Sequence, residues 1–326
     1  MTRHTPPLHL TRRAALAAAA ALATGGARAQ GKPMRIVVAF GPGSFNDLAA
    51  RDLARYMGEI LGQAIIVENK PGGGGSVGTD LVAKSAPDGT TLGLGTSSQM
   101  VMNVGLYRTL PFDVDKDLRL IGLVGRTPML LAGKQAGAKT LNELIAQARA
   151  RPGQISYGSA GAGSISHIVG EAFAKAADVQ LTHVPYKGNG PALADLAGGH
   201  VDLVFDGLAT ARPLAEQGRI RLLAMSGQRR NPAAPHLPTF AEQGVRDYEA
   251  YSWNCLMAPS RTPPELIARL NAALNQALAL PALKERFAQA GVDVLGPSTP
   301  EQADAFGHRE RERWVPFVRS LRLQVG

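Results

Sequence analysis

A strand, a glycine-containing loop and a helix follow one another within the segment Met34 to Arg55. Ile36 to Phe40 is an apolar, β-branched run bounded by glycine and proline, which is typical of a fully buried parallel strand. Gly41 and Gly43 let backbone amides approach a bound group, and a helix that starts near Asn46 directs its unpaired N–H groups at the same place. The segment therefore predicts an α/β chain with a loop suited to a small anion.

The first 29 residues are typical of an export signal. The Arg12-Arg13 pair precedes an uncharged apolar run, Ala14 to Ala23, which is too short to span a membrane. Small residues at Ala27 and Ala29 follow this run. We expect export to the periplasm with cleavage after Ala29, by the ordinary secretory route or, because of the paired arginines, by the twin-arginine route.

The charge of the chain gives little support to a nucleic-acid partner. The sequence has 35 Lys and Arg residues and 26 Asp and Glu residues, a net charge of +9. Four of the arginines precede Gln30, so 31 basic residues remain against 26 acidic ones after cleavage, a net charge of +5. The basic residues are scattered and aromatic residues make up 5% of the chain, so we expect no nucleic-acid binding.

Cys255 is the only cysteine, so an intramolecular disulfide is impossible even in an oxidising compartment. It lies in the apolar, strand-like segment W-N-C-L-M-A-P. A buried structural cysteine fits this setting better than a catalytic thiol.

Strands and helices alternate in two sets along the chain. The strands are expected at residues 36–40, 64–68, 90–95 and 118–124 in the first set, and at 129–132, 155–157, 181–184, 201–205 and 220–225 in the second. The pattern restarts with a helix capped by Thr140, and a Pro-rich stretch after Gly227 leads to a strand at Tyr251 to Ala258 and to terminal helices. We expect two α/β domains, domain 1 from residues 30–124 and 226–326 and domain 2 from residues 125–225.

Two local signals refine this outline. Arg126-Thr127-Pro128 is expected to break the strand that begins at Leu118, before an extended segment resumes at Met129. Thr262-Pro-Pro-Glu265 matches a capping box with prolines at the start of a helix.

The glycine run after the second strand resembles a dinucleotide fingerprint in its spacing. Gly73, Gly75 and Gly78 match the G-x-G-x-x-G pattern before a helix. The run follows the second strand instead of the first, and no acidic residue ends a strand about 20 residues later. We expect no cofactor, and a glycine loop that lines a cleft or packs closely against it.

Catalysis has one candidate pair, Ser164 and His167, three residues apart at the start of a helix. Adjacent turns of one helix seldom direct a base at a nucleophile. We therefore prefer Ser164 as a helix cap and His167 as a hydrogen-bonding wall residue, and expect no catalytic residues and no metal ligands. Asp47 is expected to pair with Arg51 in the first helical turn.

Several motifs together resemble one family, the Bug-type substrate-binding proteins of tripartite tricarboxylate transporters. The matching stretches are F-G-P-G-S-F-N-D-L-A-A-R (40 to 51), V-E-N-K-P-G-G-G-G (67 to 75), A-P-D-G-T-T-L (86 to 92), Y-G-S-A-G-A-G-S-I-S-H (157 to 167), H-V-P-Y-K-G-N-G-P-A (183 to 192), G-G-H-V-D-L-V-F-D (198 to 206), H-L-P-T-F-A-E-Q-G (236 to 244) and W-N-C-L-M-A-P-S-R-T-P-P (253 to 264). Their order and spacing carry the resemblance over nearly the whole chain after Gln30. Ser44-Phe45-Asn46 and Asn254-Cys255 depart from the usual pattern of the family.

The resemblance implies a periplasmic binding protein fold, with two α/β domains joined by crossing strands and a ligand cleft between them. It implies a solute-binding protein, not an enzyme, that holds a small carboxylate and passes it to membrane transporter subunits or to a sensor; we expect a monomer. A secreted α/β enzyme that uses Ser164 and His167 is the alternative.

The expected ligand site lies between the loop from Gly41 to Asp47 and the loop from Ser159 to His167. Both loops place N–H donors at helix starts on the carboxyl side of a sheet. Phe40 and Phe45 are expected to cover the apolar part of the ligand, and Asp47 and Asp206 to contact it directly or through water. The residues expected to form the ligand site are Phe40, Gly43, Ser44, Phe45, Asn46, Asp47, Ser97, Ser98, Ser159, Gly163, Ser164, His167 and Asp206.

Overall fold

The structure is a computed structural model that describes residues 33–246 and 248–323. The expected signal peptide and its cleavage point lie outside the described residues. The strands are β1 (Met34–Val38), β2 (Ile65–Asn69), β3 (Thr91–Thr96), β4 (Leu118–Pro128), β5 (Leu130–Lys134), β6 (Ser156–Ser159), β7 (Thr182–Pro185), β8 (Leu203–Asp206), β9 (Ile220–Met225), β10 (Tyr251–Pro259) and β11 (Asp293–Val294).

Helices connect most of these strands. The α-helices are α2 (Phe45–Leu61), α3 (Ser76–Ala83), α4 (Asn103–Leu106), α5 (Val114–Asp117), α6 (Leu141–Ala150), α7 (Ile165–Ala177), α8 (Asn189–Gly198), α9 (Leu208–Glu216), α10 (Pro264–Ala279), α11 (Pro281–Gln289) and α12 (Pro300–Ser320). Three short helical turns are η1 (Gly73–Gly75), η2 (Ser98–Met102) and η3 (Ala241–Gln243).

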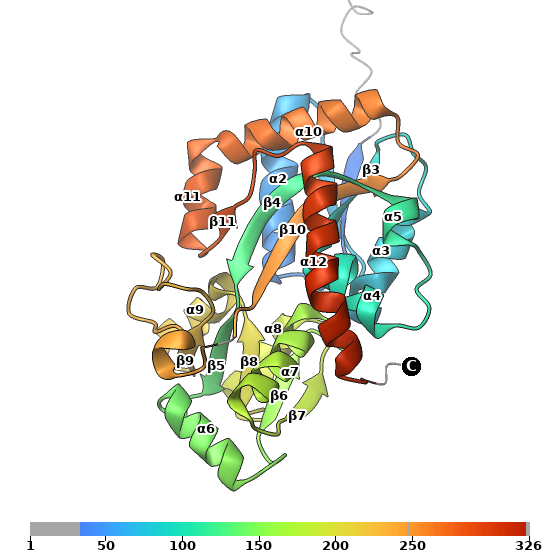
Figure 1. Ribbon diagram of the computed structural model, residues 1–326. Coiled ribbons are helices and arrows are strands. Elements are labelled where there is room, and N and C mark those ends of the chain that lie inside the picture. Colours follow the sequence, from blue (N-terminus) through green and yellow to red (C-terminus); the bar gives the residue numbers. More distant parts are fainter. Residues whose placement is uncertain (1–32, 247, 324–326) are drawn as a thin grey trace, which may run out of the picture. The chain divides into compact units, whose positions relative to one another are not determined.

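The strands form two sheets, a six-stranded one in the order β11-β4-β10-β3-β1-β2 and a five-stranded one in the order β7-β6-β8-β5-β9. In the first sheet β1 is parallel to β2 and β3, and β10 is antiparallel to β3 and β4. In the second sheet β6 is parallel to β7 and β8, and β5 is antiparallel to β8 and β9. The chain crosses from one sheet to the other between β4 and β5 and returns between β9 and β10 (Figure 1).

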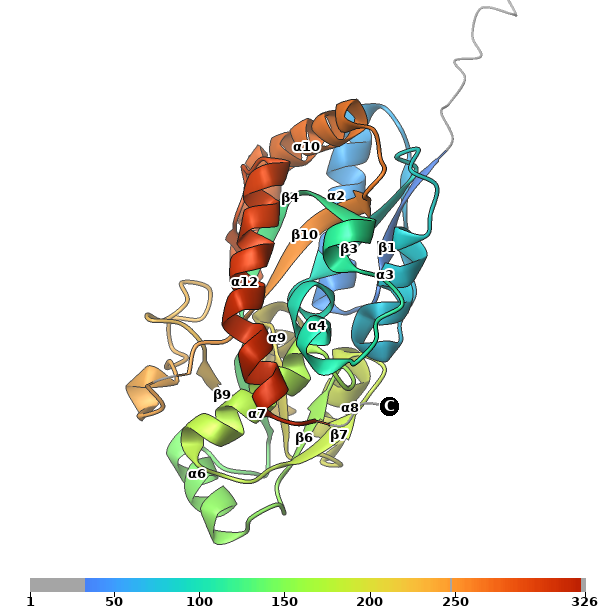
Figure 2. The ribbon, with the colours of Figure 1, turned by 45° about the vertical axis from the view of Figure 1, so that its right-hand side comes forward.

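Helices cover both faces of the six-stranded sheet (Figure 2). Along β1, Ile36 and Val38 pack into a core beneath α2 and α10, whereas Val37 enters a second core beneath α3 and α12. A strand whose successive side chains alternate between two apolar cores must be apolar throughout. This explains why the run around Ile36 is uninterrupted.

The five-stranded sheet is built in the same way. Leu203 and Phe205 of β8 pack in the core with α6 and α7, and Val204 between them packs in the core with α8 and α9. Phe240 and Tyr248, which lie between β9 and β10, join the first of these cores. The returning chain is thus anchored on the second sheet before it enters β10.

The break expected at Arg126-Thr127-Pro128 is wrong, because β4 runs unbroken from Leu118 to Pro128. β10 pairs with this end of β4, and Thr127 lies opposite Ser252. Pairing with a strand distant in the sequence supports the extended backbone where the local sequence predicted a break. Pro128 lies at the end of the strand, where proline is tolerated.

The capping box expected at Thr262 is also wrong. α10 has Pro263 at its N-cap without a side-chain hydrogen bond, and the buried Thr262 hydroxyl has no partner among the described residues. A capping box is found instead at α12, where Thr299 accepts from the backbone of Gln302 and the Gln302 side chain accepts from the N-cap backbone. Both α10 and α12 begin with proline, so a proline at the helix start does not indicate which of the two has a capping box.

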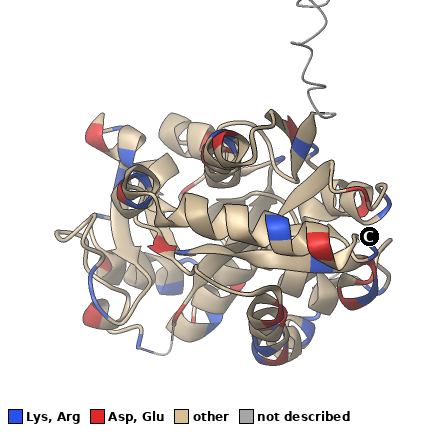
Figure 3. Ribbon diagram, turned by 90° about the horizontal axis from the view of Figure 1, so that it is seen from above, with Lys and Arg blue, Asp and Glu red and all other residues tan. Residues whose placement is uncertain are grey.

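Charges of both signs are interspersed over the described part of the molecule (Figure 3). Arg and Glu alternate from Arg309 to Arg313 on α12, and Arg311 pairs with Asp115 at 2.6 Å. Among the described helices there is none both long and apolar enough to cross a membrane.

Candidate functional site

A small cavity lies where the loops of the two sheets meet. It encloses about 40 Å³, room for about three water molecules. Its lining comes from both sheets and from both crossing strands, and consists of Phe40, Ser44, Phe45, Asn46, Thr127, Met129, Ala160, Ser164, Ile165, Ser166, Asn189, Asp206, Gly207 and Ser252. The structure thus brings together six of the side chains expected from the sequence: Phe40, Ser44, Phe45, Asn46, Ser164 and Asp206.

The helices α2 and α7 begin at this cavity with matching caps. Ser44 caps α2 by accepting from Asp47 N–H at 3.2 Å, and Ser164 caps α7 by accepting from His167 N–H at 3.3 Å. The backbone angles of the two serines are nearly the same, φ −68° and ψ 157° against φ −67° and ψ 157°. Two copies of one local motif therefore face the cavity, one from each sheet.

Three backbone N–H groups at these helix starts remain unused. Those of Phe45 and Asn46 on α2 and of Ser166 on α7 have no hydrogen-bond partner within the described ranges, and all three residues line the cavity. The first N–H groups of a helix lack intrahelical acceptors and lie at the positive end of the helix dipole. This arrangement favours a negatively charged group in the cavity.

Asp47 organises the first loop from outside the cavity lining. Its carboxylate accepts from the Gly43 backbone and the Arg51 guanidinium, both at 3.0 Å, and from the Asn69 amide, also at 3.0 Å. Burial raises the pKa of Asp47, but the hydrogen bonds from Arg51, Gly43 and Asn69 outweigh it, so the net change is a lowered pKa. The expected pairing with Arg51 is confirmed, and the Gly43 N–H is already engaged.

Asp206 is buried at the end of β8, at the cavity wall. Its carboxylate accepts from Asn189 Nδ2 and from Thr210 Oγ1, both at 2.6 Å. Asn189 in turn accepts from the Ser166 hydroxyl at 3.1 Å. Burial raises the pKa of Asp206, and the hydrogen bonds from Thr210, Asn189 and Gly207 offset this only in part.

The crossing strands supply wall residues that the sequence analysis missed. Thr127 of β4 and Ser252 of β10 lie opposite each other in the ladder, and both line the cavity. The Thr127 hydroxyl is buried without a partner among the described residues. Asn189 and Ser166 were missed as well, although both lie within stretches that the family motifs had marked.

The other expected residues lie behind this wall. Gly43, Asp47, Ser97, Ser98, Ser159, Gly163 and His167 are absent from the cavity lining. Ser97 Oγ lies 3.4 Å from Ser252 Oγ, and Ser98 Oγ accepts from Ile165 N–H at 2.8 Å, which ties η2 to the start of α7. Ser159 Oγ lies 2.6 Å from His183 Nε2.

Ser164 and His167 do not form a nucleophile and base pair. The His167 Nδ1 atom accepts from the Gly163 backbone at 3.1 Å, and the Ser164 hydroxyl contacts Ser166 Oγ at 3.1 Å. The imidazole is instead stacked on His183, with ring centroids 3.8 Å apart. Ser164 acts as the helix cap, as expected, and its hydroxyl is not activated by a base.

The two places where the sequence departs from the usual family pattern are in contact. Asn254 Nδ2 on β10 donates to Asn46 Oδ1 on α2 at 2.9 Å. The Asn254 side chain is buried, and its own oxygen has no partner among the described residues. This bond holds the amide of Asn46 at the cavity wall.

The glycine run packs against the second loop. A Cβ atom at Gly74 would lie 2.7 Å from the Ala162 carbonyl oxygen, and Gly74 has a φ of +60°. Only glycine fits such a close approach. Cys255 is buried, and burial raises the pKa of its thiol, which suits a structural role. The described residues contain no cluster of side chains that could hold a metal ion.

Two α/β sheets joined by crossing strands, with a polar cavity between them, define the periplasmic binding protein class of fold. The periplasmic binding protein BugD has this fold, with 32% identity and a TM-score of 0.85 over 88% of this chain and 97% of that chain. An R. palustris protein solved with adipate gives 34% identity and a TM-score of 0.85 over 88% and 97%. MatC from Rhodopseudomonas palustris, solved with bound malate, has 31% identity and a TM-score of 0.84 over 88% of this chain and 98% of that chain.

The family follows from the sequence as well as from the fold. The model of the family described as tripartite tricarboxylate transporter family receptor, TctC, matches residues 49–323. The chain therefore belongs to this family, and it is a solute-binding protein, not an enzyme.

Proposed function

We propose that this protein captures a small mono- or dicarboxylate in the cavity between the two sheets. The observation that carries the proposal is the convergence of the unpaired N–H groups of Phe45, Asn46 and Ser166 on one cavity. The cavity lining contains no Lys or Arg among the described residues. The carboxylate charge is therefore offset by oriented backbone dipoles, which moderate salt screens less than it screens a surface ion pair.

The ligands of related proteins and the residues that line the cavity support the proposed ligand class. The two R. palustris structures contain adipate and malate, so dicarboxylates of four to six carbons are the first candidates here. Phe40 and Phe45 line the cavity and would cover the apolar part of such a ligand. The other residues of the expected site would hold the cavity-lining residues in position from behind. They are Gly43, Asp47, Ser97, Ser98, Ser159, Gly163 and His167.

The cavity of about 40 Å³ is too small for a dicarboxylate. We infer that the ligand enters when domain 1 (residues 30–124 and 226–326) and domain 2 (residues 125–225) separate, and that the two capped loops then close around it. Because Phe240 and Tyr248 pack in the core of the second sheet, the start of the returning segment would move with domain 2. The crossing strands β4 and β10 would carry this motion.

The family membership supports delivery to the membrane subunits of a tripartite tricarboxylate transporter, with a sensor as the second possible recipient. The export signal expected within residues 1–29 would place the mature protein in the periplasm, and we propose that it acts as a monomer. Sequencing of the mature amino terminus tests the cleavage after Ala29.

The decisive experiment is calorimetric titration of the mature protein with C3 to C6 mono- and dicarboxylates and with the corresponding amides. We expect at least one acid to bind and its amide to bind far more weakly, because the cavity offers hydrogen-bond donors to a negative charge. Equal binding of acids and amides would contradict the proposal. Chemical analysis of the ligand after incubation should show no turnover.

Thr127→Val tests the cavity itself. Valine keeps the shape of threonine and removes a buried hydroxyl without a partner, so stability should be unchanged or higher. If this hydroxyl contacts the carboxylate, the binding free energy should weaken by about 0.5 to 1.5 kcal/mol, or about two- to thirteenfold in affinity. Thr262→Val is the matched control, because the Thr262 hydroxyl is also buried without a partner but does not line the cavity. Equal affinities in the two variants would place the carboxylate elsewhere.

A further inference from the structure

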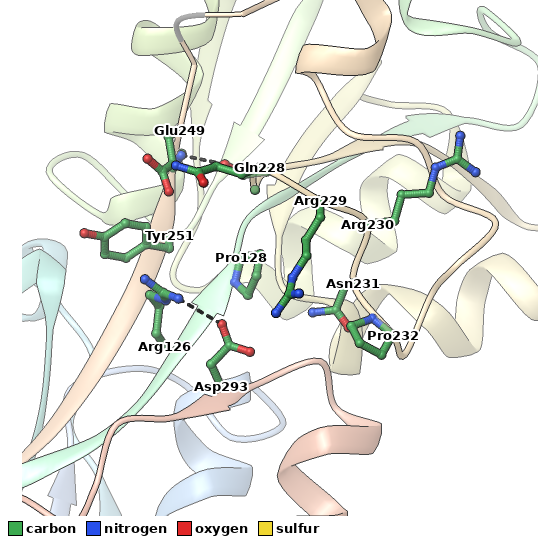
Figure 4. Close-up of a pocket in the computed structure, with 13 residues that line it drawn as sticks. Arg126, Pro128, Gln228, Arg229, Arg230, Asn231, Pro232, Glu249, Tyr251 and Asp293 are labelled. Atoms are coloured by element: carbon green, nitrogen blue, oxygen red, sulfur yellow. Dashed lines mark hydrogen bonds and ion pairs between the residues drawn. The ribbon is translucent and has the colours of Figure 1, made fainter.

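A second pocket lies on the crossing strands, separate from the cavity that holds the proposed carboxylate site (Figure 4). Its volume is about 340 Å³, at the small end of the range for small-molecule sites. Arg126 and Pro128 of β4, Tyr251 of β10, Asp293 of β11 and the loop of residues 226–232 form its walls. The two pockets share no lining residue.

Most charged side chains of this pocket have a partner of opposite sign. Arg126 pairs with Asp293 at 3.2 Å, and its guanidinium stacks over the Tyr251 ring at 5.3 Å. Glu249 lies 3.9 Å from the guanidinium of Arg313. These contacts fix Arg126 in position and neutralise both acids at the walls.

The neighbouring residues Arg229 and Arg230 differ in the direction of their side chains and in their acidic partners. Arg230 points away from the pocket in Figure 4 and donates to both carboxylate oxygens of Glu242, at 3.0 and 2.9 Å. The guanidinium of Arg229 points toward Arg126 and Asp293, and it has no acidic partner within 4.0 Å among the described residues. One positive charge in the pocket is therefore unmatched, and a second guanidinium faces it.

We propose that this pocket binds a small oxyanion, a molecule with a carboxylate or phosphate group, between Arg229 and Arg126. Planar guanidinium groups donate pairs of parallel hydrogen bonds to such groups. The site goes beyond the proposed carboxylate cavity and does not depend on it. Because its walls come from both crossing strands and from the loop that returns from the second sheet, a bound anion bridges the segments that link the sheets.

The test uses the full chain with ¹⁵N-labelled arginine, and the probes are inorganic phosphate, acetate and, as the neutral control, acetamide. Phosphate or acetate should shift the Nε–Hε resonances of Arg229 and Arg126 in a saturable way, and acetamide should not. The resonances are assigned from Arg229→Gln, Arg126→Gln and Arg230→Gln. Whether phosphate or acetate binds more tightly distinguishes the two chemical sources.

The adjacent arginines provide the matched comparison. Arg229→Gln should weaken binding at least about fivefold, because a charge-assisted hydrogen bond is lost. Arg229→Lys keeps the charge, so its affinity should lie between those of the wild-type protein and Arg229→Gln. Arg230→Gln should change the affinity less than about twofold. Thermal unfolding of each variant checks the fold. Binding should also weaken with salt, because Arg229 is exposed.

Three results would overturn the proposal. One is the lack of any saturable shift with either phosphate or acetate. The second is an equal loss in Arg229→Gln and Arg230→Gln. The third is the loss of anion binding in Thr127→Val, which would place the anion in the cavity between the sheets.

Discussion

At the scale of single residues, Asp206 places a buried carboxyl group in a cavity that we propose binds carboxylates. Two negative charges in one cavity repel each other unless one of them takes up a proton. Burial already raises the pKa of Asp206, and Asn189 and Thr210 donate to its oxygens. A bound carboxylate should raise this pKa further.

We therefore predict that ligand binding takes up protons. Affinity for the tightest acid of the panel should rise as the pH falls toward the raised pKa of Asp206, by at most about tenfold per pH unit, the limit for one proton. Titration in buffers of different ionisation enthalpy measures the uptake. Asp206→Asn should abolish it, and Glu216→Gln, which removes an exposed acid outside the cavity, should leave it intact. Uptake that survives in Asp206→Asn would show that another group titrates.

At the scale of elements, the start of α7 rests on a pair of stacked imidazoles. His167 of α7 and His183 of β7 have ring centroids 3.8 Å apart and planes 10° apart. Burial lowers the pKa of His167 to about 3, with a further contribution from His183, and burial lowers the pKa of His183 to about 4. Both rings are neutral in the folded protein at neutral pH.

This pair predicts acid lability. An unfolded histidine has a pKa of about 6.5, so between about pH 6.5 and pH 4 the unfolded chain binds more protons than the folded one. Stability is then fully present above pH 6.5 and is lost as the pH falls. In denaturant titrations against pH, His183→Gln should reduce proton uptake on unfolding near pH 5 by about one proton. His200→Gln, at an exposed site, is the control; an equal reduction there would contradict the assignment to the buried pair.

At the scale of the whole molecule, the two sheets contact each other through the loops at the cavity. Ser98 binds the start of α7, and Gly74 approaches the Ala162 carbonyl. Tyr107 Oη also lies 3.5 Å from the Ala162 carbonyl oxygen, to which it donates, and the crossing strands β4 and β10 are long and continuous. Separation of the sheets about these strands would break the loop contacts. It would also uncover Ile168 of α7, which packs in one apolar core with Leu106 of α4 and Val318 of α12.

We predict that the ligand shifts the molecule toward the closed arrangement. Small-angle scattering of the mature protein should show a smaller radius of gyration with the bound acid than without it, and the corresponding amide should have no effect. Calorimetry on the same sample confirms that the acid is bound. A radius that stays constant while the acid binds would rule out closure of domains 1 and 2.

Much of the local structure was predictable because it depends on neighbouring residues. The apolar run at Ile36, the cap of α7 at Ser164 and the pairing of Asp47 with Arg51 each involve contacts within one strand or one helical turn, and the structure has all three. The family was predictable too, since it is carried by the order of motifs along the chain.

Only the tertiary structure decided which side chains face the cavity. Thr127 and Ser252 meet there because two strands more than a hundred residues apart pair in one register, and local signals even predicted a break at Thr127. Asp47 and His167 lie in the expected loops, yet their side chains bind those loops from behind. Sequence patterns specify strands, helices and caps because these are local interactions, whereas the direction of a loop side chain is set by packing between distant segments.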